Sequence, residues 1–102
     1  MPITSATKTK DEDFINGLPV ELGSSEYVQP VLAASQQHRL KLENKFSEAV
    51  PYEITLNGNK YKEGFVKPAE VISDIQLQPG KNVIRNTGGR GSLWAKLDSF
   101  SK

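Results

Sequence analysis

The stretch YEITLNGNKYKEGFV, residues 52–66, decides the fold class of this chain. Residues 52–56 alternate apolar and polar side chains, which is the period of a strand with one buried face. Asn57-Gly58 follows at once, and this dipeptide is the strongest short signal for a two-residue hairpin turn, because both turn positions need a positive φ. A returning strand over residues 60–66 then completes a predicted antiparallel hairpin.

The same alternation, broken by turn signals such as Pro79-Gly80, continues on both sides of this hairpin. Short strands separated by turns at this spacing are typical of a sandwich or small barrel. We therefore predict an all-β fold, a small antiparallel β-sandwich of immunoglobulin-like form with an extended N-terminal arm. Its strands, about seven in number, are predicted at residues 27–32, 39–43, 52–56, 60–66, 71–77, 81–85 and 93–100. The core is predicted to consist mostly of Leu40, Leu42, Ile54, Leu56, Ile75, Leu77, Leu93, Ala95 and Leu97.

Four short segments carry a diffuse resemblance to immunoglobulin-type accessory modules: Leu40–Asn44, Pro51–Asn57, Val66–Glu70 and Leu77–Gly80. In those modules a strand that ends near Asn is followed by a hairpin, a Lys-Pro-x-Glu corner and a Leu-x-Pro-Gly corner. The resemblance covers about half the chain, concerns architecture and names no particular family. It implies a spacer, an adhesion surface or an assembly part, which is an analogy from fold alone.

The chain is predicted to divide into a polar, partly disordered N-terminal arm, residues 1–26, and a β-sandwich domain, residues 27–102. Two lysines against five carboxylates give the arm a net charge of −3, and the remaining residues carry +4. Residues 1–10 show no apolar periodicity, and residues 11–17 are predicted to form one helical turn that ends at Gly17. The apolar residues predicted to dock the arm on a partner or another copy are Phe14, Leu18 and Leu22.

Composition narrows the function classes. The 102 residues include no cysteine and a single histidine, His38, which excludes disulfides and cysteine-based catalysis or metal binding. Asp11-Glu12-Asp13 lacks the spaced oxygen ligands of a calcium loop. We expect no enzymatic activity, no catalytic residue, no metal and no cofactor. His38 is expected at the surface or at a strand end.

The glycine-rich segment 86–92 suggests an alternative function. Successive N–H groups of such a loop can hold an anion, and arginines pair with phosphate or carboxylate. Arg85, Arg90, Gly88 and Gly89 are the candidate binding residues there, and Trp94 could supply an exposed aromatic ring beside Lys96.

These observations predict a non-catalytic protein-interaction or assembly module, whose arm and loops dock on a protein partner or on another copy. The alternative is an anion, ligand or nucleic-acid binder that uses the 86–92 loop. The charge of +4 on residues 27–102 is weak for nucleic-acid binding, and the lack of a nucleic-acid motif also argues against nucleic acid as the partner. No signal peptide and no membrane span are predicted, so we expect a cytoplasmic protein or one carried in a virion.

Overall fold

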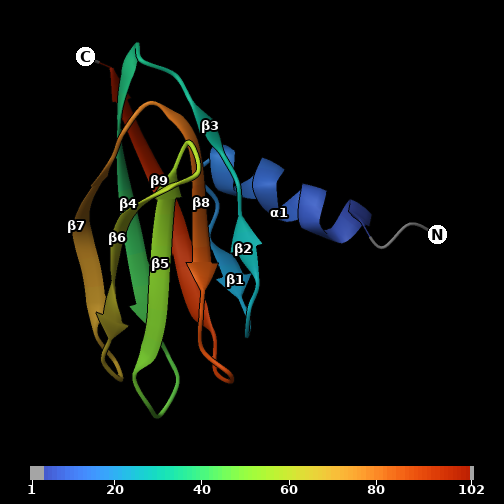
Figure 1. Cartoon of the computed structure of the whole chain (residues 1–102), viewed down its shortest axis with the longest axis vertical. Helices are drawn as coiled ribbons and strands as arrows, with labels where there is room; N and C mark the ends of the chain where they lie inside the picture. Colours follow the sequence, from blue (N-terminus) through green and yellow to red (C-terminus); the bar gives the residue numbers. More distant parts are fainter. Residues whose placement is uncertain (1–3, 102) are drawn as a thin grey trace.

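The computed structural model describes the backbone of residues 4–101 and the side chains of residues 10–100. Two antiparallel sheets pack face to face, and one helix lies at their side (Figure 1). Sheet A has the strand order β1-β9-β4-β7, and sheet B the order β2-β8-β5-β6, with β3 also paired to β8. The elements are α1 (Thr4–Ile15), β1 (Val20–Leu22), β2 (Tyr27–Val28), β3 (Val31–Leu32), β4 (Gln36–Asn44), β5 (Val50–Leu56), β6 (Asn59–Val66), β7 (Val71–Leu77), β8 (Gly80–Asn86) and β9 (Leu93–Ser101).

The predicted antiparallel sandwich is confirmed. Alternate residues of β4, β5, β8 and β9 are buried between the sheets, as the period of two in the sequence requires. Eight of the nine side chains predicted for the core are buried, and Leu56, near the hairpin, is half-buried.

Residues 4–101 contain nine strands rather than about seven, and one helix in this part of the chain makes the fold mostly β rather than all-β. The strand predicted over residues 27–32 is split into β2 and β3, because Pro30 between them has no N–H to continue a ladder. The remaining extra strand, β1, lies in the segment that was predicted to be an extended arm.

The predicted Asn57-Gly58 hairpin is confirmed by its backbone, with φ of 52° at Asn57 and 88° at Gly58. The turn is also tied to β8. The Asn57 N–H donates to the carbonyl of Lys81, and the Asn57 side-chain oxygen accepts from the N–H of Lys81.

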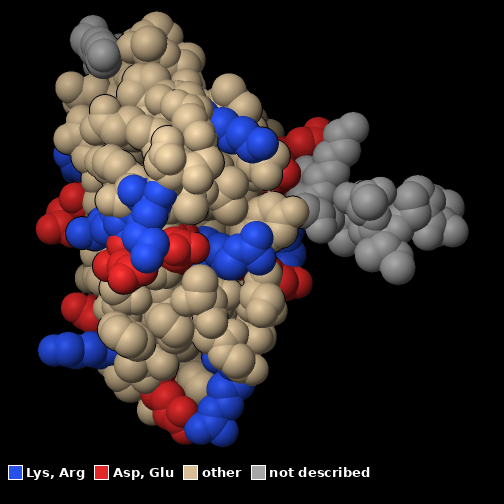
Figure 2. All heavy atoms as spheres, viewed as in Figure 1, with Lys and Arg blue, Asp and Glu red and all other residues tan. Residues whose placement is uncertain are grey.

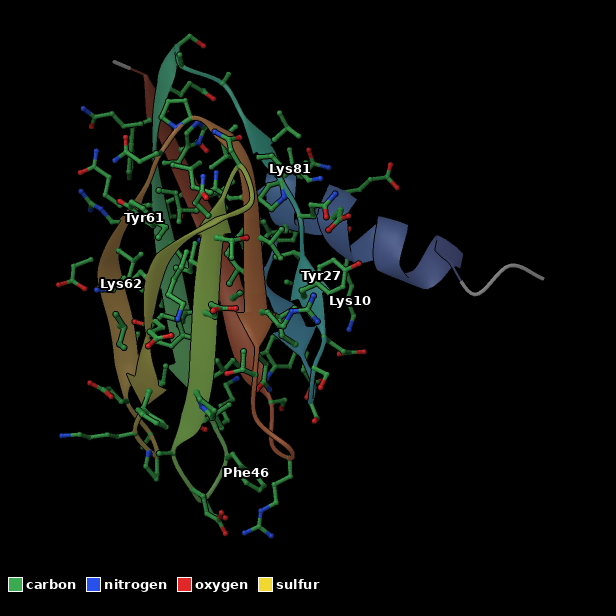
Figure 3. The ribbon with its side chains drawn as sticks, in the orientation of Figure 1. Lys10, Tyr27, Phe46, Tyr61, Lys62 and Lys81 are labelled. Carbon is green, nitrogen blue, oxygen red and sulfur yellow. The ribbon has the colours of Figure 1, made fainter. Side chains whose placement is uncertain are left out.

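Two irregularities in strand pairing change which side chains are buried. Between β5 and β6 the register shifts at Ile54/Thr55, which leaves Tyr61 as an extra residue whose hydroxyl donates to the carbonyl of Gln76 on β7 (Figure 3). Between β4 and β7 the register shifts at Leu40/Leu42. Strict alternation with Ile75 and Leu77 would place Val71 on the inner face, but the shift leaves Val71 exposed, and its neighbour Ile72 packs against the core instead.

The N-terminal segment is not an extended arm. It forms α1 and β1, and β1 pairs with β9 at the edge of sheet A. Phe14 and Leu22 are fully buried and Val20 is nearly so, in the same core as the strands of both sheets. The helix α1, Thr4–Ile15, is longer than the single turn predicted over residues 11–17, and residues 1–3 lie outside the described residues.

The end of α1 shows why the segment turns back onto the sandwich. Gly17, with φ of 84°, is the left-handed residue that was predicted to end the helix. The N–H of Gly17 donates to Phe14 and the N–H of Leu18 donates to Asp13, which together form a Schellman cap. This cap directs residues 18–22 away from the helix and along β9.

Phe14→Ala tests whether the N-terminal segment belongs to the core. We expect a loss of about 3–5 kcal/mol in the free energy of unfolding, because the ring is fully buried and its removal leaves a cavity. Leu18→Ala is the matched control, since that side chain is half exposed, and it should change stability by less than about 0.5 kcal/mol. Denaturant unfolding measures both, and equal values for the two variants would contradict the docking of α1.

Gly58→Ala tests the hairpin turn. A methyl group at Gly58 would meet no atom within 4 Å, so any cost arises from its φ of 88° alone. We expect a loss of about 1–2 kcal/mol. Gly89→Ala has equally open surroundings without a positive φ, and we expect it to change stability by less than about 0.5 kcal/mol in the same thermal unfolding experiment.

Candidate binding surfaces

Hydrogen bonds within the chain hold the 86–92 loop in place. Asn86 is fully buried, and its side-chain amide donates to the carbonyls of Leu22 and Gly91. Its side-chain oxygen accepts from the N–H of Gly88, and the N–H of Thr87 donates to the carbonyl of Pro51. Two N–H groups of the loop, those of Thr87 and Gly88, are therefore already used within the fold.

The two other glycines of the loop behave differently. Gly91 has a φ of 83°, and a Cβ there would come within 2.6 Å of the Phe46 ring, so only glycine fits. Gly89 borders open space. The neighbouring Arg90 forms an exposed ion pair with Glu48.

Arg85 and Trp94 lie on opposite outer faces of the sandwich, so the cluster predicted around the loop does not form. Arg85, on β8, stacks 4.5 Å from the Tyr27 ring centre on sheet B and donates to the carbonyl of Ser25. Trp94, on β9, lies on the outer face of sheet A opposite Glu43. The expected pairing of Trp94 with Lys96 on one outward face follows from the alternation of β9, and the structure agrees.

The residues expected to dock an arm are divided by the fold. Phe14 and Leu22 are buried in the core of this chain and are not free to contact a partner. Leu18, which follows the helix cap, is 51% exposed. The helix is also held to the sandwich by polar contacts. Lys10 forms an ion pair of 2.6 Å with Glu26 beside Tyr27 (Figure 3), and Asp11 accepts from the N–H of Gln29. The hydrogen bond from Lys10, with a second from the N–H of Gly23, lowers the pKa of Glu26.

His38 lies near the start of β4, which agrees with the expected strand end, but it is buried rather than at the surface. Its Nδ1 lies 2.9 Å from the hydroxyl of Ser99, and its Nε2 lies 3.0 Å from the carbonyl of Ala33. These contacts connect the start of β4 to β9 and to the turn that precedes β4. Alternation along β4 places His38 with Leu40 and Leu42 on the inner face, which is the signal that could have located it.

The outer face of sheet B carries a row of charges across its strands. Arg85 on β8 is opposite Glu53 on β5, and Glu53 is opposite Glu63 on β6. Lys60 pairs with Glu63 at 2.8 Å and with Glu53 at 3.8 Å, and the contact with Glu63 raises the pKa of Lys60. Figure 2 shows this face, with acidic and basic side chains gathered in a band between two uncharged regions.

An exposed aromatic side chain lies beyond the charged row. Phe65 on β6 is 67% exposed and is opposite Pro51 on β5. It borders a hollow of about 430 Å³, the Phe65 hollow, whose lining includes Pro51, Tyr52, Glu53, Glu63, Phe65 and Thr87. The Tyr52 side chain itself belongs to the core, where burial raises the pKa of its phenol, with Asp74 adding to the effect.

A second hollow, the tryptophan hollow, lies on the outer face of sheet A. It has a volume of about 260 Å³, and its lining includes Pro19, Lys41, Glu43, Lys45, Trp94 and Lys96. The amine of Lys45 lies 5.1 Å from the centre of the Trp94 ring. Sequence analysis missed Lys41 and Lys45, because nothing in a single strand shows that β4 pairs with β9.

The described part of the chain has neither a cluster of metal ligands nor a membrane-spanning helix. Among its His, Asp and Glu side chains, no group of three or more is placed to hold a metal ion. None of the helices described is both long and apolar enough to cross a membrane.

Comparison with known proteins assigns no family to this chain. No protein-family model matches the sequence. A search of curated proteins likewise found no significant match. The proposal of a function therefore rests on the outer faces of sheets A and B.

Asn86→Ala tests the pinning of the loop. The change leaves the carbonyls of Leu22 and Gly91 and the N–H of Gly88 without their partner, and each unpaired buried group costs about 1–3 kcal/mol. We expect the free energy of unfolding to fall by more than about 2 kcal/mol. Asn59→Ala, at an exposed hairpin position, should change it by less than about 0.5 kcal/mol. A small loss at Asn86 in denaturant unfolding would show that the loop is free.

Proposed function

We propose that this protein is a non-catalytic assembly module that associates with a second copy of itself through the outer face of sheet B. The observation that supports the proposal is the exposed Phe65 beside a hollow large enough to receive an aromatic ring. A protruding side chain next to a matching recess is the arrangement that a two-fold interface needs, because the same patch must supply both halves.

The charges on this face suit the same symmetry. Along the row the order is Arg85, Glu53 and Glu63, on β8, β5 and β6. A two-fold axis along β5 would set Arg85 of each copy opposite Glu63 of the other. Opposite charges would then meet twice, once on either side of the two Glu53 carboxylates, which the same axis sets against each other between the two Arg85 side chains.

The apolar end of the face fits this axis as well. Phe65 lies on the β6 side, whereas Thr87 follows β8 on the other side of Pro51. The rotation would therefore bring each Phe65 over Pro51 and Thr87 of the second copy. An aromatic ring buried in a pocket is the usual source of most binding energy at an interface.

Pairing along the free edge of β6 is a weaker route to assembly. This strand carries Lys60, Lys62 and Glu63, and Lys62 is opposite the buried Ile54, so a charged side chain leans toward the sandwich edge. Charges placed in this way on an edge strand discourage pairing with another strand.

The other expectations from the sequence belong to this proposal. Docking by the N-terminal segment would rest on Leu18, since Phe14 and Leu22 are buried within the chain. An immunoglobulin-like character would suit a spacer or assembly part. A cytoplasmic or virion location is also part of this proposal.

Phe65→Asp tests the interface. Sedimentation equilibrium of the parent should show a mass that rises with concentration toward a dimer, and the variant should raise the dissociation constant at least about tenfold. Phe100→Asp is the matched control, because Phe100 is 44% exposed on the outer face of sheet A, and it should leave the association unchanged.

A charge exchange gives a second measurement. Arg85→Glu and Glu63→Arg should each weaken the dimer, and the double variant should recover part of the loss. A parent that stays monomeric into the millimolar range would overturn the proposal. So would equal effects of Phe65→Asp and Phe100→Asp.

A further inference from the structure

The tryptophan hollow lies on the face of the sandwich opposite the proposed dimer interface, and it brings three lysines together. Lys41 comes from β4, Lys96 from β9 and Lys45 from the residue after β4. Only one carboxylate in the lining, Glu43, opposes them, so the hollow has an excess of two positive charges.

Lys41 and Lys96 are directly opposite each other in the β4–β9 ladder. Like charges in this position destabilise a pair of strands. Lys96 has a partner at 3.3 Å in Asp98, but Lys41 forms no ion pair with any of the described side chains. The free protein therefore bears an electrostatic cost that a bound carboxylate would relieve.

The rest of the hollow is apolar and aromatic. Trp94 and Pro19 contribute its uncharged walls, and the amine of Lys45 covers the Trp94 ring from 5.1 Å. Such a site suits a ligand with one carboxylate and an aliphatic portion, because the charge meets the lysines while the carbons meet the ring.

We propose that the tryptophan hollow binds a glutamate side chain that another protein presents next to apolar residues. The carboxylate would lie between Lys41 and Lys96, with its methylene groups against Trp94 and Pro19. This function goes beyond self-association, because it uses the other sheet and a different kind of partner.

The surroundings favour a single carboxylate over a nucleic-acid strand. Glu21 is opposite Trp94 on one side and Glu43 on the other, and Asp98 follows beyond Lys96. A phosphate backbone that continued past the hollow would meet these carboxylates, whereas one glutamate flanked by apolar residues would not. Binding to nucleic acid would need a continuous basic groove.

Trp94 is the only tryptophan in the chain, so its fluorescence reports on this hollow alone. The probes are two peptides, acetyl-Ala-Leu-Glu-Leu-Ala-amide and the same peptide with Gln in place of Glu, and a third probe is hexathymidylate. We expect the Glu peptide to change Trp94 emission saturably, and the Gln peptide to bind at least about tenfold more weakly. Added salt should weaken the Glu peptide, since the site is solvent-accessible.

Two variants distinguish a binding site from a structural feature. Lys41→Gln should abolish the response to the Glu peptide and also raise the melting midpoint of the free protein, because the like-charge pair is gone. Lys96→Gln should likewise remove binding. Lys62→Gln, on sheet B, is the matched control and should leave the response unchanged.

Several outcomes would overturn the proposal. They are equal affinity for the Glu and Gln peptides, tighter binding of hexathymidylate, or an unchanged response in Lys41→Gln. The peptide titrations are done at concentrations where the protein is a monomer, and they report on sheet A. Their outcome is therefore independent of the dimer test on sheet B.

Discussion

The two sheets bury each other's inner faces, and every other feature of this protein depends on that contact. Each strand has side chains that point alternately to opposite faces, so one side of each sheet must be covered. The sheets alone do not complete the cover on the side of β1 and β2. Phe14 fills that position from the end of α1, and the Schellman cap at Gly17 lets the chain turn there and continue as β1.

Buried asparagines keep the ends of the sandwich closed. The amide of Asn44, at the end of β4, donates to the carbonyls of Glu48 and Val66, and its oxygen accepts from the N–H of Phe46. Asn86 has the same kind of role on β8, and the amide of Asn82 donates to the carbonyls of Gln78 and Gly80, although the side-chain oxygen of Asn82 has no partner among the described residues. A buried amide satisfies several backbone groups at once, which holds turns rigid that would otherwise be mobile. Because these turns are held by internal hydrogen bonds, the outer faces of the two sheets are better candidates for binding than the loops.

The two outer faces differ in chemistry. On sheet B, Glu53 and Glu63 are directly opposite each other, and basic side chains accompany them, with Arg85 opposite Glu53 and Lys60 in contact with both carboxylates. On sheet A, Lys41 and Lys96 are set against each other around Trp94. We propose the first face for contact with a second copy and the second face for contact with a carboxylate. In this proposal one sandwich presents two separate surfaces to two kinds of partner.

Local pattern determined much of this fold. The alternation in residues 52–56, with Asn57-Gly58 after it, was sufficient to predict a hairpin and a sandwich, because strand period and turn chemistry are properties of neighbouring residues. The same local rules placed Gly17 at a helix end and Trp94 on an outer face beside Lys96. They did not place α1, since among its described side chains, residues 10–15, Phe14 alone is buried in the core. Bulges at Leu40/Leu42 and Ile54/Thr55 were invisible for the same reason, and they changed which of Val71 and Ile72 is buried. The opposition of Lys41 and Lys96, and the separation of Arg85 from Trp94, were decided only by tertiary structure, because strand pairing joins residues that are far apart in the chain.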